Sequence, residues 1–477
     1  MKNFLVKRFK LKSKGSDIRT EIIAGLVVFV AMLYILPVNS GILGNMRMNV
    51  SGVFFATAIL TGLVTIFMGL FANYPIALSA GMGLNAYLAY TVYESVGQSW
   101  QRAMILLLVA GILFFVMSLT PLRQRLIESI PQGLKSAISA GLGGFILFVG
   151  LQGSGIITDN VDTLVTLGSF DDPSVLLSFL GILLVLGLLY SKNKKISRFA
   201  IPITLLVVAV AGVIITSVLY ATGNGAFAAE SGLPIAPWLD SSVSFGASGF
   251  DEVIFFGFVS GSNTETFGEM LADIFVNPES YMAIFALILV NLFDTTATLV
   301  TVGEDCGLIG PDGNLIDGRK AMIVDATGAL ICAPLGTSTV TSFAESSVGA
   351  SMGAKTGLAS CTTGILFLLA AFCYPVFSIF SYSCVTAPAL VAVGILIFSH
   401  AVKTMGKDDM ITLYAGVLTI LMMVLTYSLA NGLGIGVIAY VVMSLFAGKR
   451  ENLNPYVIGI AVLFVINFAI TAILNLI

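Results

Sequence analysis

The sequence predicts an all-α integral membrane protein of about 14 transmembrane spans, arranged as two inverted halves of seven. Three observations lead to this prediction: the composition, apolar runs of spanning length, and two interrupted runs at corresponding places in the halves. Of the 477 residues, 57% are hydrophobic and 10% are charged, and the mean hydropathy is +0.99. Soluble domains carry about 25% charged residues, so a soluble protein of this composition would have too little polar surface.

The apolar residues lie in runs of about 20, the length of an α-helix that crosses a hydrocarbon core of about 30 Å. The first seven spans are expected near residues 21–40, 52–72, 76–93, 102–120, 133–152, 174–191 and 200–220. The second seven are expected near residues 280–302, 320–334, 336–351, 356–380, 385–402, 410–428 and 431–447. A further apolar run, 455–476, indicates either a fifteenth crossing or a different division of residues 410–447.

The distribution of Lys and Arg predicts a cytoplasmic N-terminus in a multi-pass protein of the cell membrane, because cytoplasmic loops are enriched in these residues. With this orientation, only Arg47 and Arg102 fall outside. Residues 221–279 contain no Lys or Arg and eight acidic residues, so they are expected to form an extracytoplasmic loop. The predicted segments are the basic cytoplasmic N-terminus 1–20, spans 1–5 in 21–152, spans 6–7 in 153–220, the loop 221–279, the second-half core spans in 280–380, and the remaining spans in 381–477.

Neither a metal site nor a cofactor is predicted. The five cysteines have no metal-ligand spacing, and at least three of them lie inside apolar runs. They are expected to act as small apolar side chains.

The third and tenth spans differ from ordinary transmembrane helices. The third runs from Pro75 to Asn85 and the tenth from Pro334 to Glu345, each through small or hydroxylic residues. Such backbone must face protein or a wet cavity, and each span is expected to pair a short extended stretch with a half-helix. Because each half has an odd number of spans, the halves insert with opposite orientation, and interrupted spans at matching places predict a transporter site at the middle of the membrane.

Glu345 is the first candidate for that site, because an ionisable side chain inside a span costs about 2.5–3.5 kcal/mol on insertion scales and needs an explanation. If Gly336-Thr337-Ser338-Thr339 opens a half-helix, its free N–H groups point into the cavity, and Glu345 lies about two turns further on. A carboxylate there can accept two N–H donors from a flat heterocycle. The structural alternative is that Glu345 caps a helix or bonds a neighbouring hydroxyl.

The eighth span supplies a polar pair. Asn291 and Asp294 are three residues apart and so share a helix face. Asn291 offers a donor and an acceptor for a ligand, and Asp294 is a candidate for binding or protonation. The alternative for Asp294 is a hydrogen bond that holds two helices together.

Asn85 is the first-half counterpart of Glu345 and lies just beyond two glycines, so it is a further binding candidate. For Asp325, in the ninth span, a structural role is favoured over a role in coupling. Glu21 and the single histidine, His400, are expected at membrane interfaces.

Several of these segments resemble the azaguanine-type adenine/guanine/hypoxanthine permeases, a branch of the nucleobase–cation symporter-2 superfamily. The two most specific matches are Ala80-Gly-Met-Gly-Leu-Asn-Ala-Tyr87 and Gly336-Thr-Ser-Thr-Val-Thr341. The supporting matches are residues 20–25, 34–39, 293–296 and 355–358, with Glu345-Ser346. The resemblance runs in order from about residue 18 to residue 447.

The resemblance implies a core domain (spans 1–4 and 8–11), a gate domain (spans 5–7 and 12–14), and a homodimer. It also implies proton-coupled uptake of purine bases by an elevator-like movement. The family's binding residues fall on Asn85, Glu345 and the eighth-span pair. Asn291 stands where relatives often carry Asp, and an amide cannot take or release a proton, so the preferred purine, the coupling ion and its stoichiometry stay open.

Two alternatives remain beside purine transport. The same architecture serves other nucleobases, such as uracil and xanthine, and inorganic anions, although an acidic Glu345 favours a ligand with N–H donors. A remote alternative is an intramembrane aspartyl protease that uses Asp294 and Asp325, which would need two carboxylates close enough to share a proton. The sequence has no Gly-x-Gly-Asp block of that class. The prediction is therefore a transporter rather than an enzyme, with a purine base, a proton and membrane lipid as partners and no nucleic acid.

Overall fold

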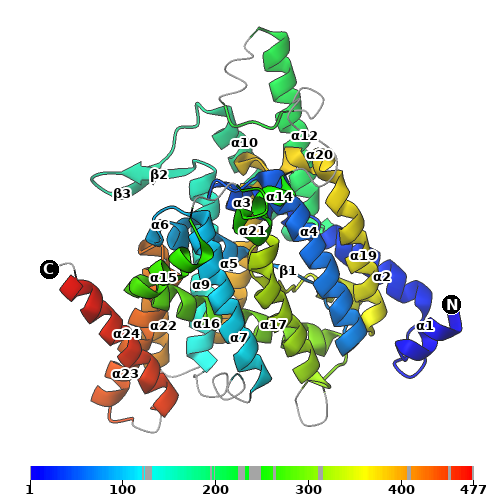
Figure 1. Cartoon of the computed structure of the whole chain (residues 1–477). Coiled ribbons are helices and arrows are strands. Elements are labelled where there is room, and N and C mark those ends of the chain that lie inside the picture. Colours follow the sequence, from blue (N-terminus) through cyan, green and yellow to red (C-terminus); the bar gives the residue numbers. More distant parts are fainter. Residues whose placement is uncertain are drawn as a thin grey trace.

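The computed structural model describes residues 2–120, 123, 132–193, 196–197, 199–223, 231–235, 249–261, 265–309, 315–405, 410–449 and 453–474. These residues form a bundle of helices that run up and down through one body (Figure 1). Within them, nine helical segments are long and apolar enough to cross a membrane. The nine coincide with the predicted spans 1, 2, 4, 5, 7, 8, 11, 12 and 14.

The first half follows the predicted order. Its elements are α2 (Ile18–Met32) and α3 (Ile35–Gly44), α4 (Val50–Phe67) with the turn η1 (Met68–Ala72), β1 (Leu78–Ala80), α5 (Met82–Tyr87) with η2 (Leu88–Val92), α7 (Trp100–Leu119), α9 (Gln132–Gly153), α10 (Pro173–Leu189) and α12 (Ala200–Ala221). The short strands β2 (Ile157–Asn160) and β3 (Leu164–Leu167) form a hairpin between α9 and α10.

The second half repeats this order. Its elements are α16 (Pro278–Asp305), α17 (Gly318–Leu335), β4 (Val340–Ser342), α18 (Ser346–Ser351), α19 (Gly357–Ala370), α21 (Ser383–Met405), α22 (Met410–Leu425) and α23 (Leu429–Phe446). The last apolar run forms a separate helix, α24 (Pro455–Leu474), which packs on α23 and α16 (Figure 1). Residues 410–447 are therefore divided as predicted, and the final run adds a helix to the fourteen spans.

Within the bundle, the strongest helix packing falls into two groups, which correspond to the predicted core and gate. In the core, α19 packs on α2 and α4, and α17 packs on α7. In the gate, α21 packs on α9 and α10, and α22 packs on α9 and α23. Close helix approach in a membrane depends on small residues. A Cβ atom on Gly357 of α19, for example, would clash with the Gly69 carbonyl oxygen.

The two interrupted spans meet each other, as β1 pairs antiparallel with β4 in the register Leu78↔Ser342, Ser79↔Thr341 and Ala80↔Val340. The ladder continues on both sides, because Gly81 N donates to Thr339 O and Phe343 N donates to Ala77 O, each at 3.0 Å. Extended backbone inside a membrane leaves N–H and C=O groups that lipid cannot satisfy. Each broken span therefore supplies the hydrogen-bond partners of the other, and a half-helix follows each strand.

The described parts of residues 221–279 are not an open loop. They include α14 (Phe250–Val253), η3 (Ile254–Gly257) and α15 (Phe267–Val276), which pack on the ends of α4, α17 and α7. Arg102, in the first turn of α7, forms ion pairs with Glu265 at 2.9 Å and with Asp273 at 2.8 Å. These charges lie at the same end of the bundle, as the predicted topology requires.

At the opposite end, the N-terminal segment that precedes α2 packs against the start of α19. After α1 (Lys2–Arg8), the side chains of Phe9 and Leu11 pack on Leu358 of α19. Glu21, expected at an interface, is fully buried, and its carboxylate accepts hydrogen bonds from Lys355 N at 2.9 Å and Thr356 N at 3.4 Å. It satisfies amide groups at the start of α19, which explains why this acid is tolerated inside the bundle.

Candidate functional site

The antiparallel pair of β1 and β4, called the β1–β4 crossing below because the two broken spans meet there, brings polar side chains from several helices together. Glu345 lies immediately before α18, and Tyr34, between α2 and α3, donates to its Oε1 atom at 2.6 Å. The Asp294 carboxyl of α16 lies beside the Thr341 side chain in β4 and within electrostatic reach of Glu345. Two carboxyl groups and two hydroxyl groups thus surround the end of β4.

The prediction that residues Gly336–Thr339 open a half-helix is wrong. Gly336 has φ of +82° and ends α17 instead, with its N–H bonded to Ala333 O and the next N–H, of Thr337, bonded to Cys332 O. A left-handed glycine is the usual C-terminal cap of a helix. The half-helix begins at Ser346, so Glu345 stands at its start rather than about two turns along it.

Asn39 of α3 organises the first-half side of the crossing, a role that the sequence did not reveal. Its Oδ1 atom accepts from Asn85 Nδ2 at 2.5 Å, and its Nδ2 atom donates to Thr57 at 2.7 Å and to Thr337 at 2.9 Å. The hydroxyls of Thr57 and Thr337 are 2.8 Å apart. All four side chains are almost completely buried. The signal was an amide inside an apolar span, five residues after Tyr34.

The structure therefore gives the predicted residues different surroundings. Thr337 belongs to the Asn39 network and joins α3, α4 and the segment before β4. Ser338 is buried, and its hydroxyl has no hydrogen-bond partner among the described residues. The Asn85 side chain donates one hydrogen bond, from Nδ2 to Asn39, whereas its buried Oδ1 atom has no hydrogen-bond partner among the described residues.

Four buried polar atoms near the crossing have no partner among the described residues: Asn85 Oδ1, Asn291 Oδ1, Ser338 Oγ and Ser342 Oγ. Buried polar groups are satisfied in the large majority of cases, so each unpaired group calls for a ligand or an ordered water. All four atoms belong to the broken spans, to the segment before β4, or to α16. This concentration marks the crossing as a place that can bind a polar molecule.

The side chains of Asn291 and Asp294 lie beside different elements, although the two residues are only three positions apart. Asn291 lines a small cavity of about 10 Å³ between α16, α7 and α17, together with Gly111, Ala329 and Thr339. A space of this size holds about one water molecule. Asp294 instead contacts β4.

Asp325 forms a buried ion pair with Arg123, which supports the structural interpretation. The two side chains are 0% and 2% exposed, and Arg123 Nη2 lies 3.4 Å from Asp325 Oδ2. Thr295 donates to the other carboxylate oxygen at 2.9 Å. Arg123 also donates to Ser118 Oγ and to Met322 O, each at 3.1 Å. Arg123 lies between the predicted spans 102–120 and 133–152, so nothing in the sequence paired it with a residue inside a span.

An aromatic contact joins the core half-helix to the gate. Thr91 of η2 donates to Tyr427 O at 2.5 Å, and the rings of Tyr90 and Tyr427 are 5.8 Å apart at 85°. Phe145 and Phe148 of α9 lie 5.2 and 5.9 Å from the same Tyr427 ring. These aromatic side chains lie between the broken span of the core and the junction of α22 and α23.

Replacing Asn39 with Ala is expected to lower the free energy of unfolding by at least about 2 kcal/mol, because the Asn85 amide loses its buried partner. Thermal unfolding of the detergent-solubilised protein measures this change. Asn45→Ala is the matched control: Asn45 is an exposed amide that donates one hydrogen bond, to Tyr90 at 2.8 Å, and its loss should cost no more than about 1 kcal/mol. Equal effects of the two substitutions would contradict the central position of Asn39.

Sequence comparison connects this chain to known permeases. Residues 19–435 match a family described as the Permease family. The guanine/hypoxanthine permease PbuG of Bacillus subtilis (strain 168) is 38% identical over 475 residues, covering 96% of this chain and 98% of PbuG. The guanine/hypoxanthine permease PbuO of the same organism is 36% identical, covering 97% of this chain and all of PbuO. The adenine permease AdeQ of Escherichia coli (strain K12) is 33% identical, covering 96% and 95%.

Solved structures agree with the fold. The transmembrane domain of a cyanobacterium bicarbonate transporter, BicA, superposes with a TM-score of 0.60 at 13% identity, covering 87% of this chain and 97% of that domain. The murine anion transporter Slc26a9 in its inward-facing state gives 0.60 at 10% identity, covering 94% and 72%. At these identities the likeness concerns architecture alone, and it is that of a 7+7 inverted repeat.

Proposed function

Because the chain belongs to the Permease family, with purine permeases among its full-length relatives, we propose that it imports purine bases across the cell membrane by proton symport. Guanine and hypoxanthine are the proposed principal substrates, since PbuG and PbuO carry these names and are 38% and 36% identical to this chain. The N-terminus is proposed to be cytoplasmic, as the Lys and Arg distribution favours.

The observation that carries the proposal is the Glu345 carboxylate at the β1–β4 crossing. A carboxylate can accept hydrogen bonds at about four lone-pair positions, and Tyr34 uses one of them at Oε1. Guanine presents adjacent N–H donors that a carboxylate can accept together. The unpaired Asn85 Oδ1 and Ser338 Oγ atoms offer further polar contacts to the ring. A base that contacts Asn85 in the first turn of one half-helix and Glu345 at the start of the other would lie between the two halves of the molecule.

Asp294 is proposed to share the coupling proton with Glu345. The two carboxyl groups are within electrostatic reach of each other, and nearby carboxyl groups can hold a single proton between them. A proton on this pair favours the loaded state, because it removes the repulsion between two buried charges. Asn291 cannot take part, since an amide does not titrate.

An elevator-like movement of the core against the gate is the proposed route of alternating access. It is supported by the stronger packing within core and within gate than between them, and by the position of Glu345, Asp294 and Asn85 on core elements. In such a movement the core carries base and proton together. The Tyr90–Tyr427 contact between core and gate would then break and re-form in each cycle.

The proposal is tested by uptake of labelled guanine, hypoxanthine and adenine into cells that lack their own purine permeases. Saturable uptake of guanine or hypoxanthine that a protonophore abolishes is the expected result, with empty-vector cells as the control. Uptake that persists in the protonophore would overturn proton symport while leaving purine transport in place. Absence of uptake for all three purines would overturn the substrate assignment.

Anion transport on the same fold is the second candidate, since the structural neighbours include bicarbonate and anion transporters. The carboxylates of Asp294 and Glu345 argue against it, because an inorganic anion at the crossing would meet two acidic groups. Unlabelled sulfate, bicarbonate, uracil and xanthine in the uptake assay separate these candidates. Competition by sulfate or bicarbonate, without competition by purines, would favour the anion.

A further inference from the structure

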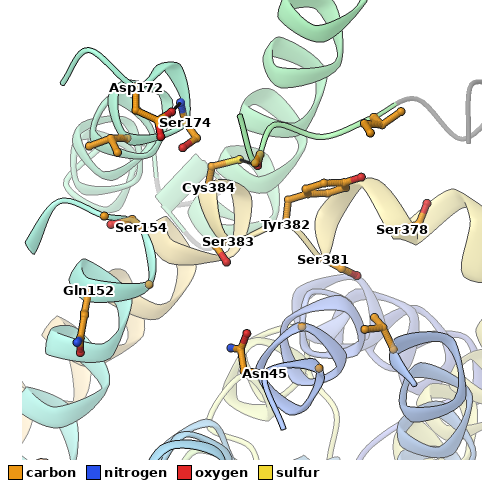
Figure 2. Close-up of a pocket in the computed structure, with 18 of the residues that line it drawn as sticks. Asn45, Gln152, Ser154, Asp172, Ser174, Ser378, Ser381, Tyr382, Ser383 and Cys384 are labelled. Carbon is orange, nitrogen blue, oxygen red and sulfur yellow. Dashed lines mark hydrogen bonds between the residues drawn. The ribbon is translucent and has the colours of Figure 1, made fainter. Parts of the chain in front are cut away.

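A large cavity lies between core and gate at the end of the bundle where α3 ends and α10 and α21 begin. Its volume is about 890 Å³. The ends of α3 and α9 and the starts of α10 and α21 surround it (Figure 2). Among the described residues that line it, none belongs to β1, β4, α5 or α18, so it is separate from the Glu345 site. With the proposed orientation, this cavity is an outer vestibule.

The vestibule is lined mainly by neutral polar side chains. Asn45, directly after α3, and Gln152 on α9 are exposed amides that lie on different sides of it (Figure 2). Among the described lining residues there is no Lys, Arg or His, and Asp172 is the single acidic one. The Asp172 carboxylate already caps α10, because its Oδ1 atom accepts from Ser174 N at 2.8 Å. The lining therefore offers hydrogen bonds but little net charge.

Two observations suggest an organic occupant rather than solvent alone. The Ser381 hydroxyl is buried at the vestibule and has no hydrogen-bond partner within the described part of the chain. Tyr374 and Tyr382 also line the cavity, and their rings offer apolar faces beside the amide and hydroxyl groups. A cavity of about 300–1,000 Å³ with apolar surface and a few placed polar groups is typical of small-molecule sites.

The chemistry of the lining selects the ligand class. An inorganic anion would require basic groups, which the described lining lacks, and a cation would find only the Asp172 carboxylate, which is already engaged. A neutral, flat heterocycle with both N–H donors and C=O or ring-nitrogen acceptors matches amides and hydroxyls. Amide side chains supply a donor and an acceptor each, and a tyrosine ring can stack on the heterocycle.

We propose that the vestibule is a second binding site for neutral purine bases, of lower affinity than the Glu345 site, which captures the base before transport. The inference rests on the proposed function. A contact links the two places: Asn45 of the vestibule donates to Tyr90 in η2, the turn that continues the half-helix of Asn85. Tyr90 in turn packs on Tyr427 of the gate. The vestibule thus borders the core–gate contact that must open for the base to pass.

The test measures equilibrium binding of labelled guanine to the purified full-length protein in lipid nanodiscs. Wild type is expected to show a tight and a weak component. Glu345→Gln should remove the tight component and leave the weak one. Gln152→Ala, combined with Ser383→Ala on the same lining, should weaken the second component about tenfold, as expected for the loss of two neutral hydrogen bonds. In cells, this double variant should raise KM for uptake about fivefold with little change in maximal rate.

Gln98→Ala is the matched control, because Gln98 is an exposed amide outside the vestibule. If Glu345→Gln removes all guanine binding, or if the double variant behaves like Gln98→Ala, the vestibule site is overturned while the proposed function stands. If wild type binds no purine, the proposed function fails and this inference fails with it. Binding of sulfate that displaces the weak component would overturn the assignment of a neutral ligand.

Discussion

Glu345→Gln is expected to reduce the initial rate of purine uptake about 100-fold. Hydrogen bonds to a charged acceptor contribute about 1.5–3 kcal/mol, which corresponds to roughly a 10- to 150-fold effect. The amide also presents an NH₂ group toward ligand N–H donors, so part of the attraction becomes repulsion. The substitution keeps an oxygen that can accept the 2.6 Å hydrogen bond from Tyr34, and the fold should therefore survive.

The measurement is the uptake rate divided by the amount of folded protein in the membrane. Glu304→Gln makes the same chemical change at an exposed carboxylate on α16 and should leave uptake unchanged. Tyr34→Phe removes one hydrogen bond but keeps the charge, so its effect should lie between those of the two Gln variants. Wild-type uptake by folded Glu345→Gln protein would remove Glu345 from the binding site.

Asp325→Asn is expected to act on stability rather than on binding. Removing one member of a buried ion pair leaves the other charge without compensation and typically costs about 3–5 kcal/mol. Here the uncompensated charge would be the Arg123 guanidinium, which is 2% exposed and lies 4.7 Å from the Phe114 ring centroid. Thermal unfolding in detergent should show the loss, whereas uptake per folded molecule should fall much less than in Glu345→Gln.

A double variant separates ion pairing from other roles of Asp325. Arg123→Met with Asp325→Asn removes both charges, and it should recover most of the lost stability, because no buried charge remains unpaired. Asp317→Asn is the surface control: its pair with Lys320 is 3.2 Å long but about half exposed and should contribute no more than about 1 kcal/mol. If folded Asp325→Asn protein binds purine but no longer accumulates it in response to an inward proton gradient, Asp325 is a coupling residue instead.

The architecture was predictable because hydropathy and backbone chemistry are local properties. A run of apolar residues is a transmembrane helix whatever its neighbours are, so the spans of both halves match the predicted ones within a few residues. The broken spans were recognisable from Pro75, Pro334 and the small residues that follow them. Glu345 and Asp294 could be identified as candidates because an acidic group inside an apolar run is energetically costly and is therefore usually functional.

The partners of the polar groups were decided only by the tertiary structure. Asn39 lies 298 residues from Thr337, and Arg123 lies 202 residues from Asp325, so spacing along the chain says nothing about these contacts. Gly336 was expected to open a helix, but whether a glycine begins or ends a helix depends on its φ angle. The vestibule likewise combines residues from five separate stretches of the chain, within 41–51, 152–155, 172–175, 232–235 and 374–384. Hydropathy and charge along the chain predict which residues lie in membrane spans and which of these are costly there, since both properties depend on side-chain chemistry. The tertiary structure decided which costly groups satisfy one another and which remain unpaired, because hydrogen bonds depend on contacts between distant segments.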